Sequence, residues 1–310
     1  MSRNYGLSRD FAAAGRIALH HAFARKEISG KSEKDLGQRW GQFVAFAREN
    51  GITKMEQVTR DSVISYGNAL AERVREEDLA ASSAQNMLSA VNTVLQFVPA
   101  AKWETVSPTK DCQIPSRSTV RSEPPIDRTA YDAARKDLQD RGLTRQEAVV
   151  ALCREFGLRS KEASLLNASG ALRKALSGGD MKVTAGTKGG RPRTVPVRTE
   201  QQIAALRYAA SVQGDAKSLV PAESTMKAWR DGGLRTAREA VQSAGGSGLH
   251  DLRAAYACER YRELTGFDAP CIAGERLASK EEDKAARFEI AKELGHGRVD
   301  VLSAYVGSSK

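Results

Sequence analysis

Residues 181–197 read MKVTAGTKGGRPRTVPV, and no other part of the chain departs so clearly from a helical pattern. Apolar and β-branched residues stand on both sides of a turn, and the turn holds the glycines Gly186, Gly189 and Gly190. Glycine tolerates the backbone angles of tight turns, and short apolar runs around such a turn are typical of a β-hairpin. We therefore expect two strands here, over residues 182–185 and 193–197.

Helical periodicity lies on both sides of this hairpin. Apolar residues recur at helical spacing in the segments that follow it, residues 201–211, 224–241, 249–264 and 285–294. The same pattern precedes the hairpin in residues 130–138 and 145–156, where Gly157 stands in a helix C-cap position. We therefore predict a mainly α fold with one small β-hairpin.

The N-terminal part of the chain predicts a small helical bundle. Four helices fit residues 7–98, and Ser32, Thr59 and Ser82 stand where N-caps belong. The polar faces of these helices are basic, and they could follow a DNA backbone or simply be solvated. The basic residues are Arg25, Lys26, Lys31, Lys34, Arg39, Arg48 and Lys54.

Residues 110–127 separate this bundle from the rest of the chain. They include Pro115, Pro124 and Pro125 and show no apolar period, so they predict an extended linker. A chain of 310 residues is also long enough for two domains, each with its own core. We expect a helical domain over residues 1–109, then the linker, then a second domain over residues 128–310.

The composition narrows the class of protein. The chain has 48 Lys and Arg against 38 Asp and Glu, which gives a formal net charge of +10. Basic proteins release counterions when they bind a phosphate backbone, so this charge favours a polyanionic partner without proving one. The cysteines lack the spacing of a zinc site or a disulfide framework, which favours a reducing cytoplasm. The longest apolar stretches are too short to span a bilayer, and we expect no membrane contact and no export signal.

Polar residues spread over the second half of the chain are candidates for chemistry: Arg159, Glu162, Lys188, His250, Arg253, His296 and Tyr305. Each alone has an ordinary explanation. Arg159 could pair with Glu162 along one helix, as charges three apart often do. His250 and Arg253 would share a helix face by their spacing alone. Tyr305 could be a packing aromatic.

Taken together, however, the order and spacing of these residues resemble the catalytic signature of the tyrosine recombinase (phage integrase) family. That signature has an arginine in a Gly-Leu-Arg-x-x-Glu segment, here residues 157–162, and a lysine in a hairpin turn, here Lys188. His-x-x-Arg follows at residues 250–253, and Leu-Gly-His at residues 294–296. Tyr305 comes after this last histidine at the family's usual interval.

The resemblance covers residues 127–305 in motif terms. It implies a C-terminal catalytic domain of the tyrosine recombinase type behind an N-terminal core DNA-binding (SAM-like) domain. The bundle over residues 1–109 matches that core-binding domain in size and helical character only.

The resemblance also implies DNA strand cleavage and rejoining without a metal ion, another cofactor or ATP. Tyr305 would attack the scissile phosphate and form a 3′-phosphotyrosyl link. Arg159 and Arg253 would clamp the phosphate oxygens, because a planar guanidinium can bind two oxygens at once. Lys188 would be the general acid that protonates the leaving 5′ oxygen.

The remaining members of the set have supporting or proton-transfer roles by the same resemblance. His250 would serve in acid or base work near the tyrosine hydroxyl. His296 would hold a phosphate oxygen. Glu162 would support the neighbouring catalytic groups rather than react.

The sequence departs from the family in three places. The interval between Arg253 and His296 is longer than in simpler members, and residues 266–284 predict a surface loop with a short helix. This insertion could shape DNA or partner contacts, or be inert. Leu302 stands where many relatives carry threonine. Only residues 306–310 follow the tyrosine, which puts assembly through a C-terminal helix in doubt, and we expect no arm-binding domain ahead of the bundle.

We therefore expect a site-specific recombinase, such as the integrase of a mobile element or prophage. Its partners would be double-stranded DNA and further copies of itself, assembled as a tetramer on DNA at the nucleoid of a bacterial cytoplasm. One alternative is a type IB topoisomerase, which His-x-x-Arg and Leu-Gly-His disfavour. The other is a DNA-binding regulator or architectural protein of the same fold, which would not need the whole catalytic set.

Overall fold

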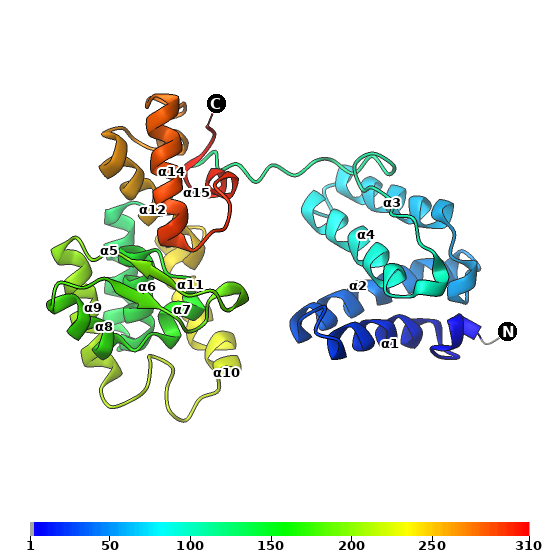
Figure 1. The fold of residues 1–310 in the computed structure, drawn as a ribbon, viewed down its shortest axis with the longest axis horizontal. Helices are drawn as coiled ribbons and strands as arrows, with labels where there is room; N and C mark the ends of the chain where they lie inside the picture. The colour runs from blue at the N-terminus through cyan, green and yellow to red at the C-terminus, as the bar shows by residue number, and fades with distance from the viewer. Residues whose placement is uncertain (1–2, 310) are drawn as a thin grey trace. The chain divides into compact units, whose positions relative to one another are not determined.

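The computed structural model describes residues 3–309, and its helices and two strands form a mainly α fold with one small hairpin, as predicted (Figure 1). Contacts divide the chain into two compact units, Met1–Ser118 and Thr119–Lys310. Each unit has a hydrophobic core of its own. The domain limits expected from the sequence remain a prediction that truncation can test.

The first unit is built from four α-helices, the number expected over residues 7–98. They are α1 (Phe11–Ala24), α2 (Gly30–Glu49), α3 (Arg60–Arg75) and α4 (Ala81–Gln96). Short 3-10 turns flank them, η1 (Arg3–Gly6), η2 (Met55–Gln57) and η3 (Pro99–Ala101). Phe11, Trp40 and Phe43 meet edge to face or tilted at the centre of this core.

The N-caps of these helices agree with the sequence prediction at one of three positions. Thr59 caps α3 by accepting a hydrogen bond from the backbone of Ser62. Ser32 is not the cap of α2, because Ser29 lies in the extended conformation and accepts from the backbone N of Ser32 at 3.1 Å. Ser82 lies inside α4, whose N-cap Ala80 makes no side-chain bond.

The second unit surrounds the helix α6 (Thr144–Phe156), in which every residue from 147 to 156 is buried. The helices that pack most extensively against α6 are α5 (Arg128–Asp140), α7 (Ser160–Leu165), α9 (Glu200–Gln213), α11 (Gly233–Ser243) and α12 (Leu249–Thr265). The remaining elements are α8 (Ala168–Leu176), α10 (Met226–Asp231), α13 (Pro270–Ala273), α14 (Lys280–Leu294), η5 (Asp300–Leu302) and α15 (Ser303–Val306). Figure 1 shows α14 and α15 beside α12, and both contact it.

The predicted hairpin is present, although its strands are shorter than expected. Strand β1 (Met181–Val183) pairs antiparallel with β2 (Arg193–Val195), with Met181 opposite Val195. The 3-10 turn η4 (Lys188–Gly190) lies between them. Along both strands the outer residues point inward and the middle one outward, so Arg193 shares the buried face with Val195.

Two parts of the helical prediction differ from the structure. Residues 224–241 do not form one helix, because the backbone breaks at Gly232 between α10 and α11. A Cβ on the next residue, Gly233, would lie 2.2 Å from the ring of Trp229. The short helices α7 and α8 were not predicted, since neither is long enough to show a clear apolar period.

The second half of the predicted linker is bound to the second unit. The backbone N of Arg121 donates to the carbonyl of Ser303 at 2.9 Å, and its side chain forms an ion pair with Asp251. The backbone N of Ile126 donates to the same carboxylate at 3.1 Å. Along residues 3–309, no helix combines the length and apolar character that crossing a membrane would require.

Candidate active site

The segment after α6 places Arg159 and Glu162. Gly157 ends the helix in the left-handed conformation, with φ of 58°, as its predicted C-cap position requires. Arg159 then becomes the N-cap of α7, and Glu162 accepts from its backbone N at 2.7 Å and from its Nη1 at 2.8 Å. Glu162 is fully buried, whereas 22% of the Arg159 side chain is exposed. This arrangement leaves the Nε and Nη2 donors of Arg159 without a partner among the described residues.

Arg253 lies in α12 and is completely buried, at 0% exposure. Its Nη1 donates to the carbonyl of Gly157 and its Nη2 to the carbonyl of Leu294. The Nη1 also lies 4.0 Å from Glu162. The Nε has no hydrogen-bond partner among the described residues. Arg253 therefore joins the segment that carries Arg159 to the end of α14.

The end of α14 places His296 next to this arginine. Gly295 adopts φ of 68°, and the backbone N of His296 returns to the carbonyl of Ala291 at 2.8 Å. The Nε2 of His296 then lies 3.3 Å from Nη2 of Arg253 and 3.2 Å from the hydroxyl of Tyr305. Tyr305 thus reaches the cluster from its own short helix, α15.

Aromatic and cation–π contacts complete the surroundings of the Tyr305 ring. Its centroid lies 5.2 Å from that of His250, at the start of α12, and 5.3 Å from that of His296. The guanidinium of Arg253 lies 5.6 Å from the same ring centroid. The structure therefore gathers five of the six predicted catalytic side chains, together with Glu162.

Lys188 is the predicted residue that the structure does not bring into contact with the others. It is exposed at the hairpin turn, and its ammonium makes no hydrogen bond or ion pair among residues 3–309. A hollow of about 510 Å³ lies between the hairpin and the end of α14, and both Arg191 and His296 line it. The hairpin is therefore a neighbour of the cluster even though Lys188 itself is free.

The segment from Tyr305 onward is held by residues of α12, of the predicted insertion and of α14. The carbonyl of Tyr305 accepts from the thiols of Cys258 and Cys271, at 3.4 and 3.6 Å. Arg287 donates to the carbonyl of Gly307 at 3.1 Å. Residues 266–284 contain the short helix expected, α13, but Cys271 in it is buried, so the insertion is more than a surface loop. The insertion packs against the backbone of Tyr305, because the thiol of Cys271 faces the carbonyl of this residue.

Burial, together with the positive charges of the cluster, lowers the pKa of both histidines. Burial lowers the pKa of His296 to about 4, and repulsion by Arg253 and Arg159 adds to the effect. Loss of hydration, followed by repulsion from the same two arginines, also lowers the pKa of His250. Both imidazoles are therefore neutral at physiological pH in the absence of a bound anion. Burial lowers the pKa of Arg253 to about 10, which leaves it charged there.

Sequence reasoning missed one residue of this cluster, Arg193 in β2. Its Nη1 and Nη2 each donate to one oxygen of Glu162, both at 2.7 Å. Its Nε donates to the carbonyl of Glu293 at 2.8 Å. Strand alternation could have indicated it, because the period of two that buries Val195 also turns Arg193 inward.

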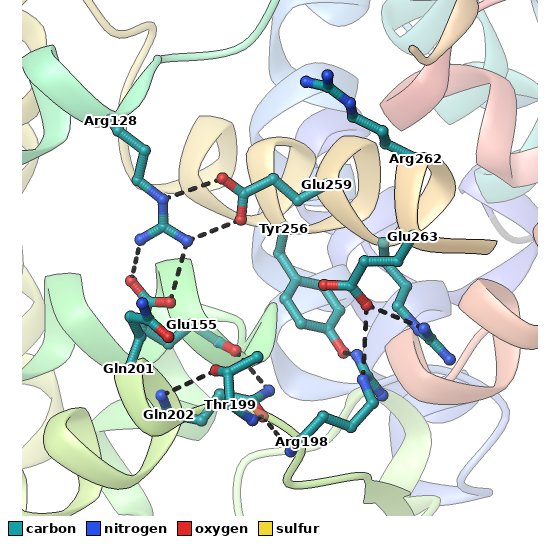
Figure 2. Close-up of a pocket in the computed structure, with 11 residues that line it drawn as sticks. Arg128, Glu155, Arg198, Thr199, Gln201, Gln202, Tyr256, Glu259, Arg262 and Glu263 are labelled. Carbon is teal, nitrogen blue, oxygen red and sulfur yellow. Dashed lines mark hydrogen bonds and ion pairs between the residues drawn. The ribbon is translucent and has the colours of Figure 1, made fainter. Parts of the chain in front are cut away.

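A second pocket lies further along α12 and contains none of the predicted catalytic residues (Figure 2). Figure 2 shows Arg128 bridging Glu155 and Glu259. Arg198 donates to the hydroxyl of Tyr256 at 3.3 Å. The charges that line this pocket are thus largely paired with one another, as expected of a structural ion-pair network.

Two protein-family models match the sequence. One, described as "Integrase", matches residues 114–259, and the other, "Phage integrase, N-terminal SAM-like domain", matches residues 19–102. The first match ends before His296 and Tyr305, so the position of these two residues rests on the geometry above. No curated protein matches the sequence.

Solved structures with a similar fold cover nearly the whole chain. A lambda integrase dimer bound to a COC′ core site has a TM-score of 0.63 at 13% identity, with 96% of this chain and 77% of that one covered. A lambda integrase tetramer bound to a Holliday junction has a TM-score of 0.61 at 12% identity, covering 94% and 75%. The Tn1549 transposon integrase in complex with circular intermediate DNA has a TM-score of 0.58 at 10% identity, covering 95% of each chain. At such identities the likeness concerns the fold.

Proposed function

The chain belongs to the tyrosine recombinase (phage integrase) family, and from this premise we propose that it cleaves and rejoins DNA through a 3′-phosphotyrosyl link to Tyr305. The observation that carries the proposal is the convergence of Arg253, His250 and His296 around one phenol, with Arg159 held in the same cluster by Glu162. Apart from His250 and Arg253, which share α12, these side chains come from segments far apart in the sequence, so local helix spacing does not explain why they meet.

The chemistry follows from the charges around the phenol. In the transition state of phosphoryl transfer, negative charge spreads over the non-bridging oxygens, and preorganised cations stabilise it. Arg159 has free donors for these oxygens, and the buried Arg253 would meet them once Tyr305 moves toward phosphorus. The same positive field favours the phenolate form of the attacking hydroxyl.

Two proton transfers accompany strand cleavage. A neutral imidazole has one nitrogen that can accept a hydrogen bond or a proton, and the Nε2 of His296 lies 3.2 Å from the tyrosine hydroxyl. His250, whose ring lies beside that of Tyr305, would be the other acceptor. Lys188 would give its proton to the leaving 5′ oxygen, after the exposed hairpin turn has closed on DNA. Rejoining reverses these steps, as another 5′ hydroxyl attacks the phosphotyrosyl ester and releases Tyr305.

The substrate and the assembly are part of the same proposal. Lambda integrase, whose fold is similar, has been solved as a dimer bound to a core site and as a tetramer bound to a Holliday junction. By extension, this chain would bind double-stranded DNA and assemble on it as a tetramer, within the bacterial cytoplasm at the nucleoid. Its net charge of +10 suits a polyanionic substrate.

Trapping on nicked DNA tests this function without knowledge of the recognised site. The protein is incubated with a random-sequence duplex library that carries scattered nicks, denatured, and analysed for DNA that stays attached. A nick near the cleavage site lets the leaving strand diffuse away, so the covalent intermediate accumulates. We expect covalently bound DNA strands that share a common sequence, which sequencing would identify.

The matched control is Tyr305→Phe, which removes only the attacking oxygen. This variant should bind the selected duplex with unchanged affinity in a gel-shift assay and leave no covalent product. If the wild-type protein binds DNA but never becomes attached to it, the chain is a DNA-binding protein of this fold without cleavage.

A further inference from the structure

Arg193 has no part in the chemistry proposed above, although it is one of the most completely bonded arginines near the cluster. Only 4% of its side chain is exposed. It forms a two-pronged ion pair with Glu162, with both N···O distances at 2.7 Å. Its Nε donates to the carbonyl of Glu293 at 2.8 Å. All three nitrogens of the guanidinium therefore have a protein partner.

These contacts join three segments that each carry a predicted catalytic residue. Strand β2, which holds Arg193, continues from the turn of Lys188. Glu162 holds Arg159 through both its backbone N and its Nη1. Glu293 lies in the last turn of α14, directly ahead of the segment that carries His296.

The close packing around Gly295 supports the same linkage. A Cβ at this glycine would lie 2.8 Å from the Cδ of Arg193, and its φ of 68° disfavours other residues as well. The aliphatic part of Arg193 therefore lies against the turn that presents His296. Moving this arginine would open space directly behind that turn.

Glu162 needs a cationic partner because a buried carboxylate loses its hydration. Burial by itself raises the pKa of Glu162, but the hydrogen bonds and charges of Arg193 and then of Arg159 together outweigh it, so the pKa is lowered. Arg159 contributes less to the shift, and it is the partner that must remain available for DNA. Arg193 is thus the residue that compensates the buried charge.

We infer that Arg193 is a positioning residue of the active site: it fixes the carboxylate of Glu162, and this carboxylate in turn aims Arg159 at the scissile phosphate. The inference rests on the proposed function, since it concerns the same site. It also implies that the side chain of Arg193 fixes the position of the hairpin that carries Lys188 relative to the segment that carries His296.

Arg193→Gln should lower the single-turnover cleavage rate by about ten- to a hundredfold at neutral pH, the usual effect of losing a residue that orients a functional group. The cleavage rate of Arg193→Lys should lie between those of Arg193→Gln and the wild type, because lysine keeps the positive charge but cannot donate two parallel hydrogen bonds to the carboxylate. The substrate is the nicked duplex that traps the wild-type protein, and affinity for it should not change.

The pH dependence distinguishes positioning from general destabilisation. In Arg193→Gln, burial raises the pKa of Glu162 against the opposition of only Arg159 and the more distant Arg253, whose Nη1 lies 4.0 Å away, so Glu162 is protonated over a range in which the wild type is charged. Arg159 is then held less well at low pH. The rate of the variant relative to the wild type should therefore rise with pH.

Glu162→Gln and the double variant test whether Arg193 acts through this carboxylate. Once Glu162 is replaced, Arg193→Gln should cause little further loss, because residues that act as a unit are not additive. The pH dependence of the relative rate should also disappear. These variants, with Arg193→Lys, keep the test available if Arg193→Gln alone does not fold.

Arg154→Gln is the matched control for loss of a buried arginine. The Arg154 side chain is 2% exposed and pairs with Glu259, outside the cluster. This variant should lose stability, while its cleavage rate relative to the wild type stays the same across the pH range.

The outcomes separate this inference from the proposed function. If the wild type forms the covalent product and Arg193→Gln matches it at every pH, or if the losses in Arg193→Gln and Glu162→Gln multiply, the inference is overturned and the function stands. If the wild type forms no covalent product, the function fails and thermal unfolding decides the inference. The melting-temperature gap between wild type and Arg193→Gln should then widen from about pH 5 to about pH 8, and a constant gap would overturn it.

Discussion

His296 touches both the arginine and the tyrosine of the cluster, and its ionisation gives a test at the scale of one residue. Burial lowers its pKa from 6.5 to about 4. The unfolded chain therefore binds this proton more readily than the folded one, so His296 opposes folding as the pH falls from 6.5 toward about 4. We therefore expect the unfolding free energy of His296→Asn to decrease less than that of the wild type as the pH falls from 6.5 to about 4.

Urea unfolding of the DNA-free protein at several pH values measures this effect. The carboxylates titrate in both proteins, so the difference between wild type and variant isolates the histidine. Equal slopes for the two proteins would show that burial and the neighbouring arginines do not lower the pKa of His296.

The residues of the site were predictable to the extent that their motifs and order resemble those of the tyrosine recombinase family. The motifs around Arg159, His250 and His296 identified segments that do meet in the fold. Arg193 was not identified, because an arginine in a short strand is usually solvated and its partner Glu162 is distant in sequence. The exposed place of Lys188 also could not be predicted, since spacing says nothing about whether a turn is closed.

The turn between α6 and α7 supports a prediction at the scale of an element. Gly157 has φ of 58°, and a Cβ there would lie 2.5 Å from the ring of Tyr256. Its carbonyl also accepts from Arg253. Gly157→Ala should therefore lose about 2–4 kcal/mol of unfolding free energy, from backbone strain together with overpacking.

Gly142→Ala provides the matched control for this turn. Gly142 has a similar φ of 67°, but nothing lies within 4 Å of a Cβ there. It should lose only the cost of the left-handed conformation, about 1–2 kcal/mol. If denaturant unfolding shows the same loss for both alanines, the crowding around Gly157 has no energetic consequence.

Helices were predictable from the sequence where their apolar period runs over several turns. The helices and the break that were missed each have a cause in their own short segment. The patterns of α5, α6, α9, α12 and α14 each run over several turns. The helices α7 and α8 are short, and they form because the surrounding unit buries them. The break at Gly232 was missed because the apolar period continues across it, and only the ring of Trp229 beside Gly233 reveals it.

The division of the chain into two units gives a prediction at the scale of the whole molecule. A fragment of residues 119–310 keeps the bonds of Arg121 to Ser303 and Asp251, whereas a fragment of residues 128–310 loses them. Asp251 is buried, and a buried charge without its partner costs about 3–5 kcal/mol. The shorter fragment should therefore melt about 6 °C or more below the longer one.

Arg121→Gln in the longer fragment is the control for this comparison, and it should reproduce most of the decrease. Equal melting temperatures for the two fragments would place the domain boundary at residue 128, as expected from composition alone. The proline-rich sequence indicates where the chain is extended, but it could not indicate that this stretch binds a carboxylate more than a hundred positions away.

Whether Tyr305 becomes joined to DNA is the question on which the whole account depends, and mass spectrometry of the trapped complex answers it most directly. The complex is digested with protease and nuclease, and the peptides that carry a nucleotide are sequenced. We expect one modified peptide, with the nucleotide 3′-phosphate on the oxygen of Tyr305. A nucleotide on any other residue, or no modified peptide from a protein that binds the same duplex, would contradict the account.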